Sequence, residues 1–140
     1  MAFLTACGGS SNGQQQAEST ALAFGEAFFN YDFEQAGKLV TPESMKWLRF
    51  VASNLNEDDL RVLNSREGAA DVELSESVMA DDTTCNVRLL VSNYMSTDSI
   101  GKPGVVHEAP EAVTVRVVLR EKQWKVRMEG LPRSERHSHD

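Results

Sequence analysis

Few residues in this chain have the types and spacing that catalysis requires. Glu76 is the one polar residue on the otherwise apolar face of a predicted strand, where a carboxylate would have a raised pKa and could act as a general base. The alternative, which we favour, is a bulge or strand end that turns Glu76 to solvent. The three histidines, His107, His137 and His139, fall in a predicted loop and in the tail, so we expect no buried His–Asp dyad.

Metal, nucleophile and nucleotide chemistry also lack a matching motif. The sequence contains no nucleophile elbow, Walker loop, HExxH motif or dinucleotide fingerprint. His137 and His139 could both reach a metal, but two ligands on a chain terminus make a poor site, so we interpret them as part of a solvated tail. Neither Cys7 nor Cys85 has a CxxC partner, which excludes a zinc ribbon or a thioredoxin-type site. We therefore expect no cofactor, no metal site and no enzymatic activity.

The composition indicates one acidic, folded domain. The chain has 140 residues, of which 41% are hydrophobic and 25% charged, and this suits a single sizeable core. Its formal net charge is −7 and it contains no basic stripe, so we set aside a nucleic-acid partner. The same charge disfavours binding to anionic headgroups, and no apolar run is long enough to span a membrane.

The first residues resemble the end of a bacterial lipoprotein signal. The motif LTAC at residues 4–7 is similar to a lipobox, in which a branched residue and two small residues precede the cysteine that receives lipid. Only six residues precede Cys7, so we expect translation to start further upstream. Residues 10–16 are polar and uncharged, which predicts a flexible tether beyond the anchor. The alternative is a disordered N-terminus that happens to contain a cysteine.

The lipobox resemblance implies that the chain has a membrane partner through a lipid anchor at Cys7. Several acyl chains on that cysteine would hold the protein firmly in a bilayer. Gly8, and not an aspartate, follows the cysteine, which by resemblance to lipoprotein sorting in enteric bacteria favours the outer membrane. We therefore expect a domain of the bacterial cell envelope that is anchored to the outer membrane and faces the periplasm.

The first half of the domain is predicted to be helical. Residues 22–40 are expected to form two short consecutive helices, the first of which carries aromatic side chains at helical spacing. Asp32 is expected to cap the second helix, which would end near Val40. Two further helices are predicted to begin at Pro42, which follows a threonine, and after Asn56, which precedes three acidic residues.

The second half changes to the period of a β-strand. After Gly68, apolar residues alternate with polar ones in four segments, which predicts an antiparallel sheet with one buried and one wet face. Cys85 falls on the apolar face, where a free thiol behaves as a small hydrophobe. The predicted inward positions are Val72, Leu74 and Val78; Cys85, Val87, Leu89 and Val91; Val113, Val115, Val117 and Leu119; and Trp124, Val126 and Met128.

This order of elements resembles the nuclear transport factor 2-like (cystatin-like) superfamily. Helices that contain the run FFNYDFEQA, at residues 28–36, come before a long hairpin-rich sheet, as in small bacterial lipoprotein domains of unknown function. The resemblance covers residues 17–130, after a signal remnant and tether over 1–16 and before a disordered tail over 131–140. It implies an α+β fold whose N-terminal helices pack in the concave face of a curved, cone-like antiparallel sheet. The mouth of that cone is a ligand or active site in some members.

Three functions from different classes fit these observations. The first is a non-enzymatic envelope lipoprotein that binds a small ligand or a partner protein, in a pocket lined by Tyr31, Trp47 and Asn93, with Glu76 as a further pocket residue. The second is a homodimeric structural or assembly module, which a flat apolar sheet face left uncovered would favour. The third is an enzyme that uses Glu76 as its base. Asp32 could also reach the cone mouth, although a helix cap explains it more simply. Because no dyad is evident, we favour the first function.

Overall fold

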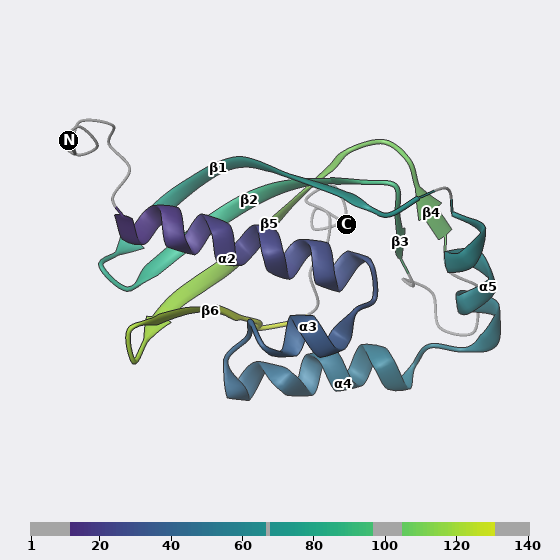
Figure 1. Cartoon of the computed structure of the whole chain (residues 1–140), viewed down its shortest axis with the longest axis horizontal. Helices are drawn as coiled ribbons and strands as arrows, with labels where there is room; N and C mark the ends of the chain where they lie inside the picture. Colours follow the sequence, from purple (N-terminus) through teal and green to yellow (C-terminus); the bar gives the residue numbers. More distant parts are fainter. Residues whose placement is uncertain (1–11, 67, 97–104, 131–140) are drawn as a thin grey trace.

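The computed structural model describes residues 12–66, 68–96 and 105–130, and it places helices against one face of a curved sheet (Figure 1). The helical elements are α2 (Asn12–Phe29), α3 (Phe33–Gly37), the 3₁₀ helix η1 (Pro42–Ser44), α4 (Met45–Ser53) and α5 (Glu57–Ser65). The strands are β1 (Asp71–Asp81), β2 (Thr84–Ser92), β3 (Tyr94–Ser96), β4 (Val105–His107), β5 (Glu111–Arg120) and β6 (Gln123–Arg127). Four strands form an antiparallel sheet in the order β1-β2-β5-β6. This confirms the predicted α+β class, with helices in the concave face of a cone-like sheet.

Helix α2 lies along the concave face of the sheet and supplies the aromatic part of the core. Ala21, Phe24 and Phe28 recur at helical spacing, and all three are buried. The rings of Phe24 and Phe28 stack with their centroids 5.5 Å apart. A Cβ atom at Gly25 would lie 3.0 Å from Val72 Cγ1 of β1, so glycine lets the helix approach the sheet closely at this point.

Helix α2 begins earlier than the sequence predicts. It starts at Asn12, so residues 12–16 of the predicted tether are helical. Glutamine is a good helix former, and Gln14 also makes a tertiary contact, because its Nε2 donates to Ser77 Oγ at 2.8 Å. Ser77 Oγ in turn donates to Glu18 Oε2, which ties the first turns of α2 to β1.

The corner after α2 follows the prediction at its start and departs from it at its end. Tyr31 turns the chain in a left-handed conformation, with φ 61°. Asp32 caps α3 as predicted, because its side chain accepts a backbone hydrogen bond from the first turn of that helix. The helix ends at Gly37, short of the predicted end, because Val40 forms a parallel bridge with Val126 of β6 instead.

The two later helices begin close to their predicted starts. Pro42 opens a helical turn, although this turn is the short 3₁₀ helix η1 that leads into α4. The Asn56 cap is confirmed as a reciprocal capping box: Asn56 Oδ1 accepts from the Asp59 N–H at 2.9 Å, and Asp59 Oδ2 accepts from the Asn56 N–H at 3.1 Å. Ser44 Oγ of η1 accepts from the Met128 N–H at 2.8 Å, which ties the helical layer to the chain after β6.

Strand β1 contains a bulge that alters its alternation. Leu74 pairs with Leu89 and Glu76 pairs with Arg88, so Ser75 is an extra residue on β1. Because side chains alternate along a strand, this extra residue moves the side chains from Glu76 to Met79 to the other face, and a second register shift follows between Met79 and Asp81. Glu76 is therefore exposed on the outer face of the sheet, opposite Arg88, where the bulge alternative places it.

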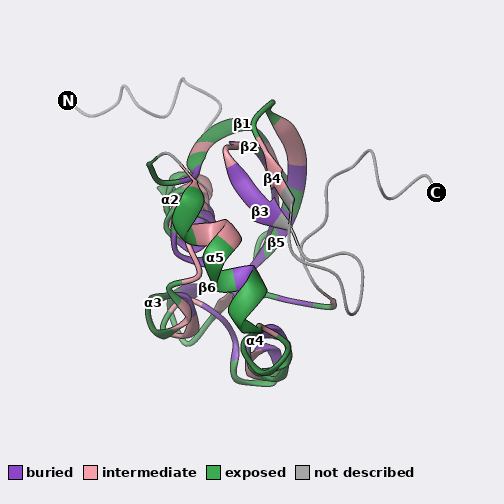
Figure 2. Ribbon diagram, turned by 90° about the vertical axis from the view of Figure 1, so that its right-hand side faces the viewer, coloured by how far each residue is buried: buried purple, intermediate pink, exposed green. Residues whose placement is uncertain are grey.

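The bulge overturns the predicted inward position of Val78. This residue lies on the outer face and is 60% exposed. Ser77 and Met79 take the inward positions instead, paired with buried residues of β2. Leu74 keeps its predicted side but is 39% exposed because β1 is an edge strand. Figure 2 shows the resulting contrast. The residues of β1 are exposed or half-buried, whereas buried residues alternate along β2.

The segment predicted as a long link contains two short strands. β3 pairs with β4, and the ring of His107 on β4 stacks on the ring of Tyr94 with centroids 5.0 Å apart. His107 therefore lies in a strand and not in the predicted loop. Of the helices within the described residues, none has both the length and the apolar character that crossing a membrane requires.

Candidate functional site

A crevice of about 330 Å³ opens where β6 ends beside β5. Its floor is apolar and reaches the core, because Phe24 of α2, Val126 of β6 and Met128 are all buried. Ligand sites typically have volumes of about 300–1,000 Å³, so the crevice is at the small end of that range. The polar residues of its rim are Asn86, Thr114, Arg116, Arg127 and Glu129.

Strand alternation divides the crevice into an apolar floor and a polar rim. Val115 and Val126 point into the core, and the next residues, Arg116 and Arg127, point outward. The pairing of β5 with β6 stops at Arg116 and Arg127. The chain then leaves the sheet, because the Met128 N–H donates to Ser44 Oγ of η1 and not to a neighbouring strand. The stretch of β5 before Arg116 is left without a β6 neighbour, and this opens the crevice.

The charges on the rim form a cluster of two guanidinium groups and one carboxylate. Arg116 Nη1 donates to Glu129 Oε2 at 3.1 Å, and Arg127 Nε lies 3.6 Å from the same oxygen. Arg116 and Arg127 are direct cross-strand partners. All three side chains are about half exposed, at 45%, 43% and 54% for Arg116, Arg127 and Glu129. The cluster therefore has one positive charge in excess, and it lies within reach of solvent.

Two of the residues predicted to line a pocket, Tyr31 and Asn93, lie near the end of α2 and not in this crevice. The Tyr31 hydroxyl donates to the Met95 carbonyl at 3.2 Å, and Asn93 Nδ2 donates to the Ala69 carbonyl at 3.1 Å. Both residues are in the left-handed region, with φ 61° and 55°. The Asn93 carbonyl also accepts from Arg66 Nη1 at 3.4 Å, so these residues surround an arginine that the sequence did not single out.

The other two predicted pocket residues, Trp47 and Glu76, belong to separate surfaces. Trp47 is half-buried on α4, where Lys46 Nζ lies 5.4 Å from its ring centroid. Glu76 is exposed on β1, and Figure 1 shows that α4 and β1 lie on opposite sides of the molecule. The structure therefore does not bring the four residues into one pocket, and none of them lines the crevice.

Arg66 follows α5 and joins it to the end of α2. Its Nη1 donates to the Phe29 carbonyl at 3.2 Å and its Nη2 to Asn30 Oδ1 at 2.9 Å. Asn30 Oδ1 also accepts from the Ala70 N–H at 2.8 Å. Burial lowers the pKa of Arg66, and within the described residues its buried Nε has no hydrogen-bond partner. A lone arginine after a predicted helix gives no periodic signal, so sequence reasoning missed this set of Arg66 hydrogen bonds, which we call the Arg66 clamp.

The remaining side chains that could react or bind a metal lie away from the crevice. Cys85 is buried among core residues, and burial raises the pKa of its thiol, so it behaves as the predicted small hydrophobe. Cys7, the predicted lipidation site, lies outside the described residues, as do His137 and His139. In the parts of the chain that the structure describes, no three His, Cys, Asp or Glu side chains come together as metal ligands.

Helices in the concave face of a curved antiparallel sheet are the fold that the sequence resemblance to the nuclear transport factor 2-like superfamily implies. One similar solved structure, of a proposed aromatic ring hydroxylase from Novosphingobium aromaticivorans, is 16% identical, with a TM-score of 0.46 over 90% of this chain and 95% of that chain. Another, of an NTF2-like protein involved in plasmid conjugation, is 15% identical, with a TM-score of 0.40 over 84% of this chain and 48% of that chain. No protein-family model matches the sequence, and no curated protein matches it.

Proposed function

We propose that this chain is a binding module of the bacterial cell envelope. It binds a small ligand in the β5–β6 crevice and does not catalyse a reaction of that ligand. The crevice itself carries this proposal, because it joins a floor of core residues to a charged rim that solvent can reach. Small-molecule sites join apolar walls to polar groups that orient the ligand, and five of the ten residues that line this crevice are polar.

The chemistry of the crevice residues supports binding over catalysis. Arginine stays protonated near neutral pH, so neither Arg116 nor Arg127 is suited to exchange a proton with a ligand. Glu129 is half exposed and forms ion pairs with both guanidinium groups. The side chains that line the crevice, within the described residues, include no His or Cys. They can orient a ligand through hydrogen bonds and charge.

Binding of 1-N-phenylnaphthylamine, an uncharged dye that fluoresces more strongly in apolar surroundings, tests this function. Gly130 lines the crevice, and a Cβ atom there would meet nothing within 4 Å, so Gly130→Phe adds a ring beside the crevice without a clash at Cβ. Gly130→Ala is the matched control. We expect the wild type and Gly130→Ala to bind the dye, and Gly130→Phe to bind it several-fold more weakly. Equal binding by all three proteins, or binding by none, would contradict the proposal.

A second candidate is a homodimeric assembly module, favoured by apolar side chains on the outer face of the sheet. Val78 and Leu90 lie on this face and are 60% and 36% exposed. The charged residues Glu76 and Arg88 lie between them, so the apolar surface is broken. Analytical ultracentrifugation of the wild type and Val78→Lys tests this candidate. A dimer that the substitution dissociates would support it, and a monomer at all concentrations would remove it.

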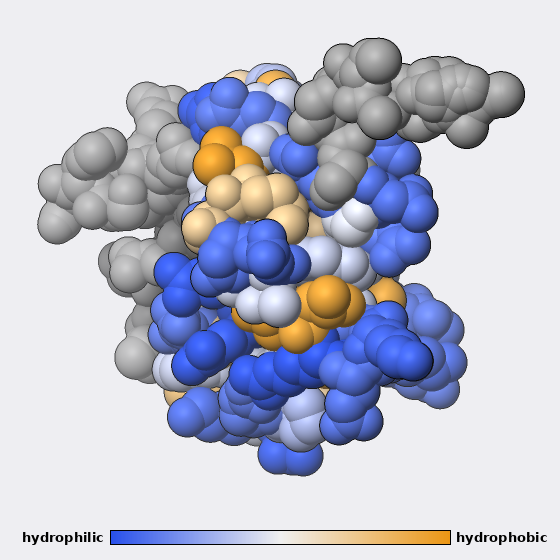
Figure 3. Space-filling view, turned by 90° about the vertical axis from the view of Figure 1, so that its left-hand side faces the viewer, coloured by the Kyte–Doolittle hydropathy of each residue, from blue (hydrophilic) through white to orange (hydrophobic). Residues whose placement is uncertain are grey.

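We also propose that lipid on Cys7 holds this module at the outer membrane, facing the periplasm. The lipobox-like residues 4–7 and the glycine after them support this placement. Four residues separate Cys7 from the start of α2 at Asn12, a distance of at most about 18 Å when extended. The membrane would then lie near the N-terminal end of α2 and the β1–β2 and β5–β6 turns (Figure 1). Figure 3 shows this end as largely hydrophilic with small apolar patches, so acyl chains would provide the attachment.

Replacing the acylated cysteine tests the anchor independently of the crevice. In the full-length gene product, we expect Cys7→Ala to abolish acylation and to release the protein into the soluble fraction. Cys7→Ala protein that stays in the membrane fraction would contradict the proposed anchor.

A further inference from the structure

We infer that the β5–β6 crevice takes an amphipathic organic anion, a carboxylate or sulfonate with an apolar body, and that Glu129 is its built-in competitor. This inference rests on the proposed binding function and adds the chemical class of the ligand. The geometry that carries it is the placement of two guanidinium groups beside one carboxylate above an apolar floor.

The register of the sheet brings two positive charges side by side. Arg116 and Arg127 are paired residues of β5 and β6, and their side chains point to the same face. Like charges directly opposite each other destabilise a strand pair unless an anion lies between them. Glu129 supplies that anion, but only Arg116 is within hydrogen-bond distance of its Oε2, at 3.1 Å, whereas Arg127 Nε is 3.6 Å away. The second guanidinium group therefore has room for a better anionic partner.

Glu129 is placed so that a ligand can displace it. The carboxylate is 54% exposed, and exposed ion pairs contribute only about 0.2–1 kcal/mol each. Glu129 follows Met128, whose N–H donates to Ser44 Oγ, and precedes Gly130, where a Cβ atom would meet nothing within 4 Å. The side chain can thus swing away from the two arginines while the backbone on its N-terminal side stays fixed.

The floor of the crevice determines the rest of the ligand. Phe24, Val126 and Met128 offer only hydrocarbon, an aromatic ring and a thioether, so the part of the ligand that reaches them must be apolar. The chain as a whole has a net charge of −7, so the excess positive charge on this rim is local and opposite in sign to the rest of the protein. Charge complementarity therefore favours an anionic head over a cationic or neutral one.

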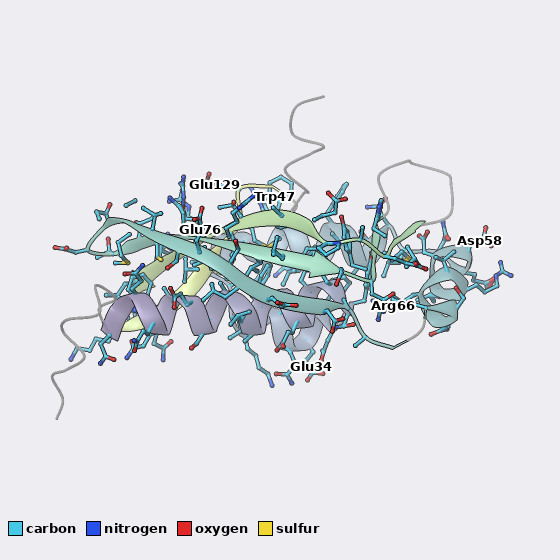
Figure 4. All side chains as sticks on the ribbon, turned by 90° about the horizontal axis from the view of Figure 1, so that it is seen from above. Glu34, Trp47, Asp58, Arg66, Glu76 and Glu129 are labelled. Atoms are coloured by element: carbon cyan, nitrogen blue, oxygen red, sulfur yellow. The ribbon has the colours of Figure 1, made fainter. Side chains whose placement is uncertain are left out.

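A pair of fluorescent dyes separates the anion from the apolar body. The probe is 8-anilinonaphthalene-1-sulfonate, and its control is uncharged 1-N-phenylnaphthylamine, which has the same rings without the sulfonate. Both are titrated into the whole chain and into Glu129→Gln, Arg127→Gln and Glu34→Gln. Glu34→Gln changes the net charge as Glu129→Gln does, and Figure 4 shows Glu34 on the opposite side of the molecule from Glu129.

We expect Glu129→Gln to bind the sulfonate about two- to fivefold more tightly and Arg127→Gln to bind it more weakly by a similar factor, while the uncharged dye responds to neither. Glu34→Gln should leave both affinities unchanged. If the uncharged dye binds in the crevice but the sulfonate is insensitive to Glu129 and Arg127, the anion inference is wrong and the binding function stands. If neither dye binds, or Gly130→Phe leaves binding of both intact, the proposed function falls as well.

Discussion

Arg66 and Arg127 carry the same guanidinium group, but their surroundings differ in burial and in the groups that they contact. Arg66 is partly buried and donates to two backbone carbonyls and one amide oxygen from two segments of the chain. Arg127 is 43% exposed, and its contact with Glu129 is a long ion pair. The first cation holds the end of a helix in place, whereas the second can exchange its partner for a ligand. The comparison indicates that partners and burial, more than residue type, separate a fold residue from a binding residue.

The largest effect is expected from removing the partly buried guanidinium group of Arg66. Arg66→Met leaves the Phe29 and Asn93 carbonyls without this donor, and we expect it to lower the free energy of unfolding by about 2–4 kcal/mol. Urea unfolding followed by circular dichroism measures the change. Arg127→Met is the matched control and should stay within about 0.5 kcal/mol of the wild type. Equal losses in the two variants would remove the distinction between the two arginines.

A smaller effect is expected when the amide that Arg66 contacts is removed. Asn30 Oδ1 accepts from both Arg66 and the Ala70 N–H, so Asn30→Ala should cost about 1–2 kcal/mol of unfolding free energy. Asn86→Ala removes the same side chain from the crevice rim and should cost less than about 0.5 kcal/mol. Comparable urea midpoints for Asn30→Ala and the wild type would show that the Arg66 clamp does not depend on this amide.

A third arginine, Arg120, allows a test through pH. It contacts both carboxylate oxygens of Glu43, at 2.8 and 2.6 Å, and this hydrogen-bonded pairing lowers the pKa of Glu43 from 4.5 to about 2. A lowered pKa stabilises the fold above pH 4.5, and this contribution is lost as the pH falls from 4.5 to about 2. The pair is exposed, so the effect should be small.

The measurement for this pair is the difference in urea midpoint between the wild type and Glu43→Gln across that pH range. We expect the difference to be largest above pH 4.5 and to vanish near pH 2. The pKa of Asp81 is also lowered, chiefly by the Thr83 N–H, and because both proteins contain Asp81 the difference isolates Glu43. A difference that stays constant with pH would rule out the ion pair as its source.

The smallest effect on stability is expected at the crevice. Glu129→Gln removes two ion pairs, but both are exposed and exposed pairs contribute little, so the free energy of unfolding should change by less than about 0.5 kcal/mol. Thermal and urea unfolding measure this directly. A loss above about 1 kcal/mol would make Glu129 a structural residue and would weaken its assignment as a displaceable competitor.

The sequence was informative about elements and poor at combining them into a site. Helical spacing of Phe24 and Phe28 and the alternation along β2, β5 and β6 predicted the core correctly, because burial imposes these periods. The polar Glu76 on an apolar face indicated a bulge or a strand end, but the effect of a bulge on the later residues was not carried forward, so the inward position of Val78 was predicted wrongly. The crevice depends on the register that sets Arg116 opposite Arg127 and on where β6 ends. Neither the register nor that end point is determined by residue types within one segment.

The most direct test of the binding crevice maps where the uncharged dye binds. Two-dimensional ¹H–¹⁵N NMR spectra of the whole chain are recorded while 1-N-phenylnaphthylamine is titrated. We predict that the largest shift changes occur at residues 114–116 and 126–130, around the crevice floor and rim. Changes centred instead on Tyr31, Arg66 and Asn93 would contradict the binding crevice and move the site to the end of α2, where two of the four predicted pocket residues lie.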